Sequence, residues 1–178
     1  EQVQAEGMQG TVGIAHTRWA THGGPVVANA HPHIAGNRIA LVHNGIIENF
    51  AQLRAELEAT GVTMQSQTDT EVLAHLVNFY LEDDLLEALK KALSRVTGAY
   101  AVAVFDKRHP ERIVGARQGS PMVVGLGEGE NFIASDAMAL VGVTDKIVYL
   151  DDGDIVSMTK DTCEIFARTG SDTWQPVE

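Results

Sequence analysis

The pattern of apolar and polar residues divides the chain into an early part with helical spacing and a later part of short strands. Apolar side chains recur every three or four positions in three segments, which is typical of amphipathic helices. Asn49 is placed to cap the first helix, and Thr68 and Glu71 have the spacing of a capping box for the second. The predicted inner faces are Phe50, Leu53 and Leu57; Val72, Leu73, Leu76, Val77 and Tyr80; and Leu85, Leu86, Leu89, Ala92, Leu93 and Val96.

Strands are predicted on both sides of these helices. Apolar runs predict strands over 10–17 and 37–43, with a long irregular loop over 19–36 between them and a short strand over 62–66. Asn44-Gly45 is a strong turn signal, which predicts that the second strand ends there. Further strands are predicted over 99–106, 113–117, 122–126, 131–135, 146–150, 154–159 and 164–167, with a short helix over 136–140.

Short turns join most of the late strands, and connections this short make neighbouring strands antiparallel. Helices that cluster early and hairpins that cluster late favour an α+β fold, in which helices cover antiparallel sheets, over a doubly wound parallel sheet. The length of 178 residues suits one domain, so we expect residues 1–178 to form a single domain.

Charge and composition limit the classes of partner that the chain is expected to bind. The chain has 13 basic and 24 acidic residues, and a net charge of −11 disfavours nucleic acid. No apolar run approaches the ~20 residues of a membrane span. Cys163 is the sole cysteine, which fits a reducing, cytoplasmic compartment, and its acidic neighbours Asp161 and Glu164 favour a structural role over a nucleophilic one.

The stretch 16–24, His-Thr-Arg-Trp-Ala-Thr-His-Gly-Gly, gathers polar donors on a predicted loop. Such a loop is either a binding site or a polar turn whose histidines are merely hydrogen-bonded. A metal site is a further reading, because His31 and His33 have a spacing that can ligate a metal ion. No acidic residue occurs between Gly7 and Ile47, however, so a carboxylate ligand would have to come from elsewhere.

Three other features together suit the binding of an amino-acid amide. The guanidinium of Arg18 is a fork for a carboxylate, and Asp69 at a predicted helix start could accept hydrogen bonds from an ammonium. The Asn44 amide beside the backbone N–H of Gly45 gives two donors that could stabilise an oxyanion. Glutamine has the three matching groups: an α-carboxylate, an α-ammonium and a side-chain amide whose oxygen becomes the oxyanion.

Several motifs, in this order, closely resemble the glutaminase domain (glutamine amidotransferase type 2) of the glutamine–fructose-6-phosphate aminotransferases. They are His-Thr-Arg-Trp-Ala-Thr-His-Gly (16–23), Asn-Ala-His-Pro-His (29–33), Val-His-Asn-Gly-Ile-Ile-Glu-Asn (42–49), Thr-Asp-Thr-Glu (68–71), Gly-Ala-Tyr-Ala (98–101), Arg-Gln-Gly-Ser-Pro (117–121) and Asn-Phe-Ile-Ala-Ser-Asp (131–136). The resemblance implies an N-terminal-nucleophile hydrolase fold, an αββα sandwich of antiparallel sheets between helices, here without its opening strands.

The resemblance also implies the reaction and the residues. Glutamine is hydrolysed, and the ammonia passes to a separate isomerase domain that makes glucosamine 6-phosphate from fructose 6-phosphate, with no cofactor or metal in the glutaminase half. The family's full-length enzymes are typically homodimers. The implied roles are carboxylate binding by Arg18, ammonium binding by Asp69, the oxyanion hole for Asn44 and Gly45, the closing loop for Thr21 and His22, and gating of the ammonia path for Trp19.

The chain departs from the family pattern at the nucleophile. The family uses an N-terminal cysteine, whereas residue 1 is Glu and Cys163 matches no catalytic position. We therefore expect a glutaminase domain truncated at its N-terminus, without the isomerase domain and inactive alone. The alternative is a non-catalytic glutamine-binding module, whose reading frame would contain no upstream segment that begins with cysteine.

Overall fold

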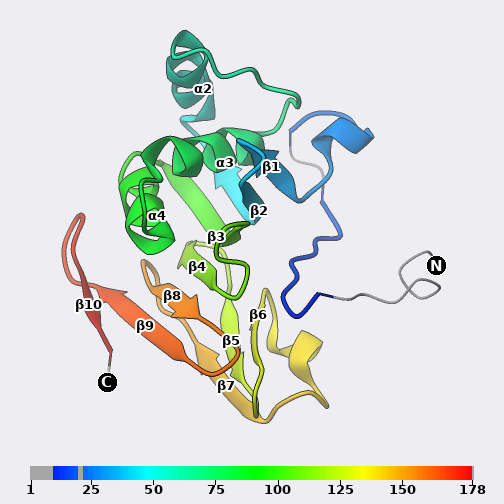
Figure 1. The fold of residues 1–178 in the computed structure, drawn as a ribbon, viewed down its shortest axis with the longest axis vertical. Helices are drawn as coiled ribbons and strands as arrows, with labels where there is room; N and C mark the ends of the chain where they lie inside the picture. The colour runs from blue at the N-terminus through cyan, green and yellow to red at the C-terminus, as the bar shows by residue number, and fades with distance from the viewer. Residues whose placement is uncertain (1–9, 20–21, 178) are drawn as a thin grey trace.

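The computed structural model describes residues 10–19 and 22–177, and it contains two antiparallel sheets and three α-helices (Figure 1). The larger sheet has the strand order β1 (His33–Ala35), β2 (Ile39–Ile47), β3 (Gly98–Asp106), β4 (Ile113–Gln118), β8 (Ile155–Met158), β9 (Cys163–Arg168) and β10 (Trp174–Pro176). The smaller has the order β6 (Asn131–Ala134), β5 (Val123–Leu126) and β7 (Lys146–Tyr149). The helices are α2 (Phe50–Ala59), α3 (Asp69–Tyr80) and α4 (Leu85–Leu93), with 3₁₀ turns η1 (Val27–Asn29) and η2 (Ala137–Leu140).

The strand β3 separates two hydrophobic clusters, because alternate side chains on a strand point to opposite faces of the sheet. Tyr100, Val102 and Val104 belong to the larger cluster, which they share with the inner faces of the three helices. Ala101 belongs to the smaller cluster with Val124 of β5, so the three-stranded sheet covers the opposite face. The layers are therefore helices, large sheet and small sheet, and the predicted α+β fold with antiparallel sheets is confirmed.

The helices begin where the sequence predicts. The hydroxyl of Thr68 accepts a hydrogen bond from the backbone N–H of Glu71, as expected for the start of α3. Asn49 precedes α2, but its side chain does not cap that helix; it bonds instead to the backbone of Arg95 and Thr97. The third helix ends at Leu93 rather than at Val96. No helix in the described part of the chain is long and apolar enough to cross a membrane.

Two predicted strands are absent. Residues 11–19 alternate between exposed and half-buried positions, but no strand in the described ranges pairs with them. A strand requires a ladder partner as well as a period of two, which explains the wrong prediction. Over 62–66, the backbone N–H groups of Gln65 and Ser66 donate to the Glu71 carboxylate. They therefore bond to a side chain of α3 and not to a neighbouring strand. Two short strands, β1 and β10, were not predicted.

The predicted turn at Asn44-Gly45 is also wrong, because β2 continues through it. All nine residues of β2 pair with β3, from Ile39 opposite Asp106 to Ile47 opposite Gly98. Gly45 adopts a φ of 127°, and a Cβ there would collide with the carbonyl of Ala99. A long partner strand thus overrides the local turn preference, and only glycine fits the resulting backbone.

Candidate active site

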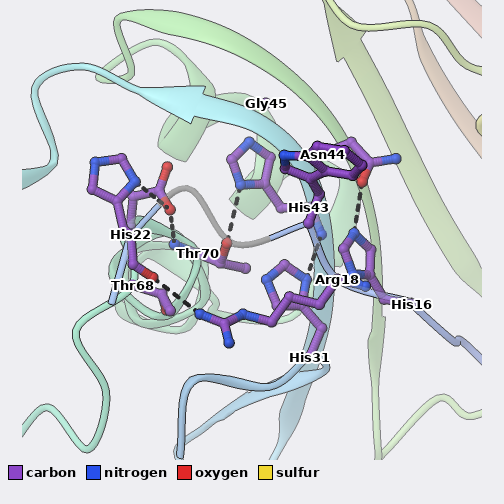
Figure 2. A pocket seen from close by; sticks show the side chains of 11 residues that line it. His16, Arg18, His22, His31, His43, Asn44, Gly45, Thr68 and Thr70 are labelled. Carbon is purple, nitrogen blue, oxygen red and sulfur yellow. Dashed lines mark hydrogen bonds and ion pairs between the residues drawn. The ribbon is translucent and has the colours of Figure 1, made fainter. Parts of the chain in front are cut away.

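A pocket lies where the end of β2, the start of α3 and the loop over 16–24 meet (Figure 2). It contains six of the seven site residues predicted from sequence, namely Arg18, Trp19, His22, Asn44, Gly45 and Asp69. The remaining one, Thr21, lies outside the described residues. The lining is completed by His16, His31, His43, Thr68 and Thr70. Thr68 and Thr70 flank the predicted acid at a helix start, which is the signal that could have identified them.

The carboxylate of Asp69 is buried at the first residue of α3, where the helix dipole favours a negative charge. One oxygen, Oδ2, accepts the backbone N–H of Ile47 at 2.9 Å, and Oδ1 accepts the backbone N–H of Thr70 at 3.0 Å. These bonds join the N-terminus of α3 to the last residue of β2. The position of the carboxylate is therefore fixed relative to Asn44 and Gly45.

His22 approaches Asp69 from the loop. Its Nδ1 lies 3.5 Å from Asp69 Oδ1, which is within ion-pair range, but this buried atom has no hydrogen bond of good geometry. The imidazole packs edge-on against Phe50 at the start of α2, with the ring centroids 4.7 Å apart. The loop therefore contacts the acid through a histidine that has an unused polar atom.

Arg18 reaches across the pocket, with its guanidinium on the side of His22 and Thr68 (Figure 2). Its Nη2 donates to the carbonyls of His22 and Gly23 at 3.1 and 3.3 Å, and its Nη1 donates to the carbonyl of Gly24 at 3.1 Å. A guanidinium has five N–H donors, so these three bonds leave two for another partner. Arg18 thus holds the glycine end of the loop through backbone carbonyls and leaves two N–H donors for a ligand in the pocket.

Asn44 and Gly45 face the pocket from β2. The side-chain oxygen of Asn44 lies 2.6 Å from Nε2 of His16, and Nδ1 of His16 accepts the backbone N–H of Arg18 at 2.8 Å. The positive φ of Gly45 departs from regular strand geometry at the same place. The loop that carries Arg18 is therefore connected to Asn44 through the imidazole of His16, which bonds both to the Arg18 backbone and to the Asn44 side chain.

Three neighbouring histidines, His31, His33 and His43, have pKa values below the usual range. Burial is the main cause that lowers the pKa of His31, to about 3, with a further contribution from His16. Burial also lowers the pKa of His33 and of His43. His43 Nδ1 lies 3.1 Å from the hydroxyl of Thr70, and its buried Nε2 has no partner. In the described ranges, no group of three or more His, Cys, Asp or Glu side chains is arranged so that it could hold a metal ion.

Two other predicted features are located by the structure. Trp19 lines the pocket and is 91% exposed, and its predicted gating role stays a prediction. Cys163 begins β9 beside the cluster between the sheets and is absent from the pocket lining. Burial, and then the charge of Glu164, raise the pKa of its thiol, which is unfavourable for a nucleophile.

Comparisons with known proteins agree on one family. A family described as "Glutamine amidotransferase domain" matches residues 16–142. The glutamine–fructose-6-phosphate aminotransferase (isomerizing) of Bordetella pertussis is 60% identical over 163 residues, which are 89% of this chain and 27% of that protein. The protein of the same name from Escherichia coli K12 is 52% identical over 167 residues, 93% of this chain and again 27% of the relative. The chain thus spans about a quarter of these relatives.

Solved structures show the same fold. A glutamine phosphoribosylpyrophosphate amidotransferase from B. subtilis has a TM-score of 0.68 and 29% identity, covering 84% of this chain and 33% of that one. A glutamine aminotransferase class-II domain protein from Silicibacter pomeroyi has a TM-score of 0.62 and 19% identity, covering 79% and 71%. The second likeness concerns the fold alone.

Proposed function

The chain belongs to the glutamine amidotransferase domain family, and from that premise we propose that it is the glutamine-hydrolysing domain of a glutamine–fructose-6-phosphate aminotransferase. The observation that carries this proposal is that Arg18, Asp69, Asn44 and Gly45, which lie far apart in sequence, line one pocket. Residues 1–178 form a single glutaminase domain, and the sugar-phosphate isomerase domain belongs to another part of the longer protein. L-Glutamine is the substrate, and the ammonia is delivered to fructose 6-phosphate.

The two charged residues suit the α-carbon end of glutamine. The buried carboxylate of Asp69 binds the α-ammonium, because it has acceptor capacity beyond its two backbone N–H donors. Arg18 binds the α-carboxylate with N–H donors that the loop carbonyls do not use. Thr21 and His22 belong to the loop that closes over the substrate, and Trp19 gates the exit of ammonia.

Asn44 and Gly45 suit the other end of the substrate. A nucleophile that attacks the side-chain amide turns its oxygen into an oxyanion, and the Asn44 amide and the Gly45 N–H stabilise that charge. Ammonia leaves, and water hydrolyses the acyl intermediate to glutamate. The nucleophile of the family resemblance is an N-terminal cysteine, whereas Cys163 lies outside the pocket. Hydrolysis therefore requires a cysteine upstream of Glu1.

The test is glutamate release from L-glutamine by a joined chain, defined as this sequence preceded by an upstream segment that begins with cysteine. The 178-residue chain alone is expected to release no glutamate, and the joined chain is expected to release it. If the joined chain folds but makes no glutamate, glutaminase activity is wrong. If it binds glutamine without hydrolysing it, the alternative of a non-catalytic binding module is correct.

In the joined chain, Arg18→Lys is expected to raise the KM for glutamine by about 10- to 100-fold, because an ammonium has only three donors and no planar fork, and so cannot hold the three loop carbonyls and a carboxylate at once. Steady-state kinetics with varied glutamine measure the change. The matched control is Arg38→Lys, since Arg38 holds both carboxylate oxygens of Asp106 outside the pocket, Oδ1 through Nε and Oδ2 through Nη2. That substitution should lower the unfolding temperature and leave KM unchanged. Equal KM values in the two variants would refute carboxylate binding by Arg18.

A further inference from the structure

We propose that His16 is a positioning residue for glutamine hydrolysis, because it holds the side-chain oxygen of Asn44 and thereby turns the amide N–H groups toward the oxyanion. The inference rests on the proposed function and extends it to a residue for which the family resemblance implied no role. Figure 2 shows the contact that carries it, a hydrogen bond between the His16 ring and Asn44 at 2.6 Å.

The hydrogen bonds of His16 determine which of its nitrogens carries the proton. Its Nδ1 accepts the backbone N–H of Arg18 at 2.8 Å, and a backbone N–H can only donate. A neutral imidazole has one acceptor and one donor, so Nε2 carries the hydrogen. The group that faces Nε2 must then be an acceptor, which assigns the oxygen of the Asn44 amide to that side.

The orientation of Asn44 matters because packing does not hold it. The residue is exposed on β2, and within the described residues its Nδ2 makes no hydrogen bond. A rotation of about 180° about the last side-chain bond would exchange oxygen and nitrogen, since this torsion is broad and roughly two-fold. The exchanged form would point a carbonyl oxygen at the developing negative charge. The bond from His16 selects the form that donates.

His16 is itself held from a second segment. Its ring stacks on the ring of His31, with centroids 4.1 Å apart and planes 26° apart. His31 in turn receives the backbone N–H of His43, the residue before Asn44, at 3.4 Å. The low pKa of His31, about 3, keeps that ring uncharged beside His16. Asn44 of β2 is therefore bonded to His16, His16 stacks on His31, and His31 is bonded to His43 of the same strand.

The same contacts argue against two other roles for His16. A general base needs a free ring nitrogen in the pocket, but both nitrogens of His16 have partners. A metal ligand needs an unprotonated ring nitrogen with its lone pair free, and that of Nδ1 is used by Arg18. Positioning of Asn44 is the role that uses both observed bonds.

The experiment measures kcat and KM of the joined chain after His16→Phe, which keeps an aromatic ring for the stack on His31 but removes the donor. We expect kcat to fall about 10- to 100-fold with KM nearly unchanged. His16→Gln, which retains an N–H donor, should recover most of the loss. His109→Phe changes an exposed histidine outside the pocket and serves as the matched control.

A double substitution separates positioning from any independent effect. If His16 acts through Asn44, then His16→Phe added to Asn44→Ala should cause no further fall in kcat. A further fall similar to that of the single substitution would overturn the inference, as would an unchanged kcat for His16→Phe. A raised KM with normal kcat would also overturn it.

The protonation of His16 can be read without activity from the ¹⁵N shifts of its ring in the unsubstituted joined chain. We expect the tautomer with hydrogen on Nε2, and hydrogen on Nδ1 would overturn the inference. The tautomer of His16 can be measured whether or not the chain hydrolyses glutamine, and whether or not the Phe variant folds. An inactive joined chain would therefore count against the proposed function, and the wrong tautomer against the role of His16.

Discussion

Replacing Asn44 with alanine in the joined chain is expected to lower kcat for glutamine hydrolysis by about 10²- to 10³-fold, while KM changes little. An oxyanion donor acts in the transition state, where the amide oxygen becomes charged, and contributes less to binding of the neutral amide. The substitution leaves β2 intact, because Asn44 is exposed and its backbone pairs with Ala101 of β3. Initial rates of glutamate formation at saturating glutamine measure the loss.

The control for Asn44 lies in the same strand. Ile46 is 45% exposed and is not part of the pocket lining, so Ile46→Ala should leave kcat within the error of the measurement. A value of kcat in Asn44→Ala equal to that in Ile46→Ala would show that Asn44 stabilises no oxyanion. A large rise in KM with unchanged kcat would instead make Asn44 a ground-state contact.

Asp69→Asn is expected to raise the KM for glutamine by about 10²- to 10³-fold, because it removes the charge that pairs with the α-ammonium in a buried site. Asparagine has nearly the shape of aspartate, and its remaining oxygen can still accept one of the N–H groups from Ile47 and Thr70. The effect on folding is therefore smaller than that on binding. Substrate saturation curves and thermal unfolding of the same preparation separate the two.

The matched control for Asp69 is Glu71→Gln, which changes a second buried carboxylate two residues further along α3. Glu71 accepts the N–H groups of Gln65 and Ser66 and does not line the pocket. Its loss should lower the unfolding temperature without raising KM. The ammonium role of Asp69 is wrong if both variants have the KM of the unsubstituted chain.

The helices and late strands were predictable because their signals are local. The capping geometry of Thr68 and Glu71 and the apolar period of α3 act within one or two turns of chain. The failures are at residues whose partners are distant. Asn44-Gly45 has the local preference of a turn, but pairing with Ala101 and Tyr100 in β3 keeps it extended.

The site shows the same division. The roles proposed for Arg18, Asp69 and Asn44 come from residue type and motif, and the structure brings these three residues together in one pocket. The bond from His16 to Asn44 spans 28 positions, and the carbonyl partners of Arg18 depend on how the loop folds back. No spacing rule predicts such contacts, because they arise only when β2, α3 and the loop are packed together.

The most direct test of the glutamine site is a calorimetric titration of L-glutamine into the joined chain with its leading cysteine replaced by alanine, which prevents turnover. We expect one glutamine per chain in the unsubstituted pocket. Asp69→Asn should raise the dissociation constant about 10²- to 10³-fold. Glutamine that fails to bind, or that binds equally to both chains, would contradict a site built around Asp69, Arg18 and Asn44.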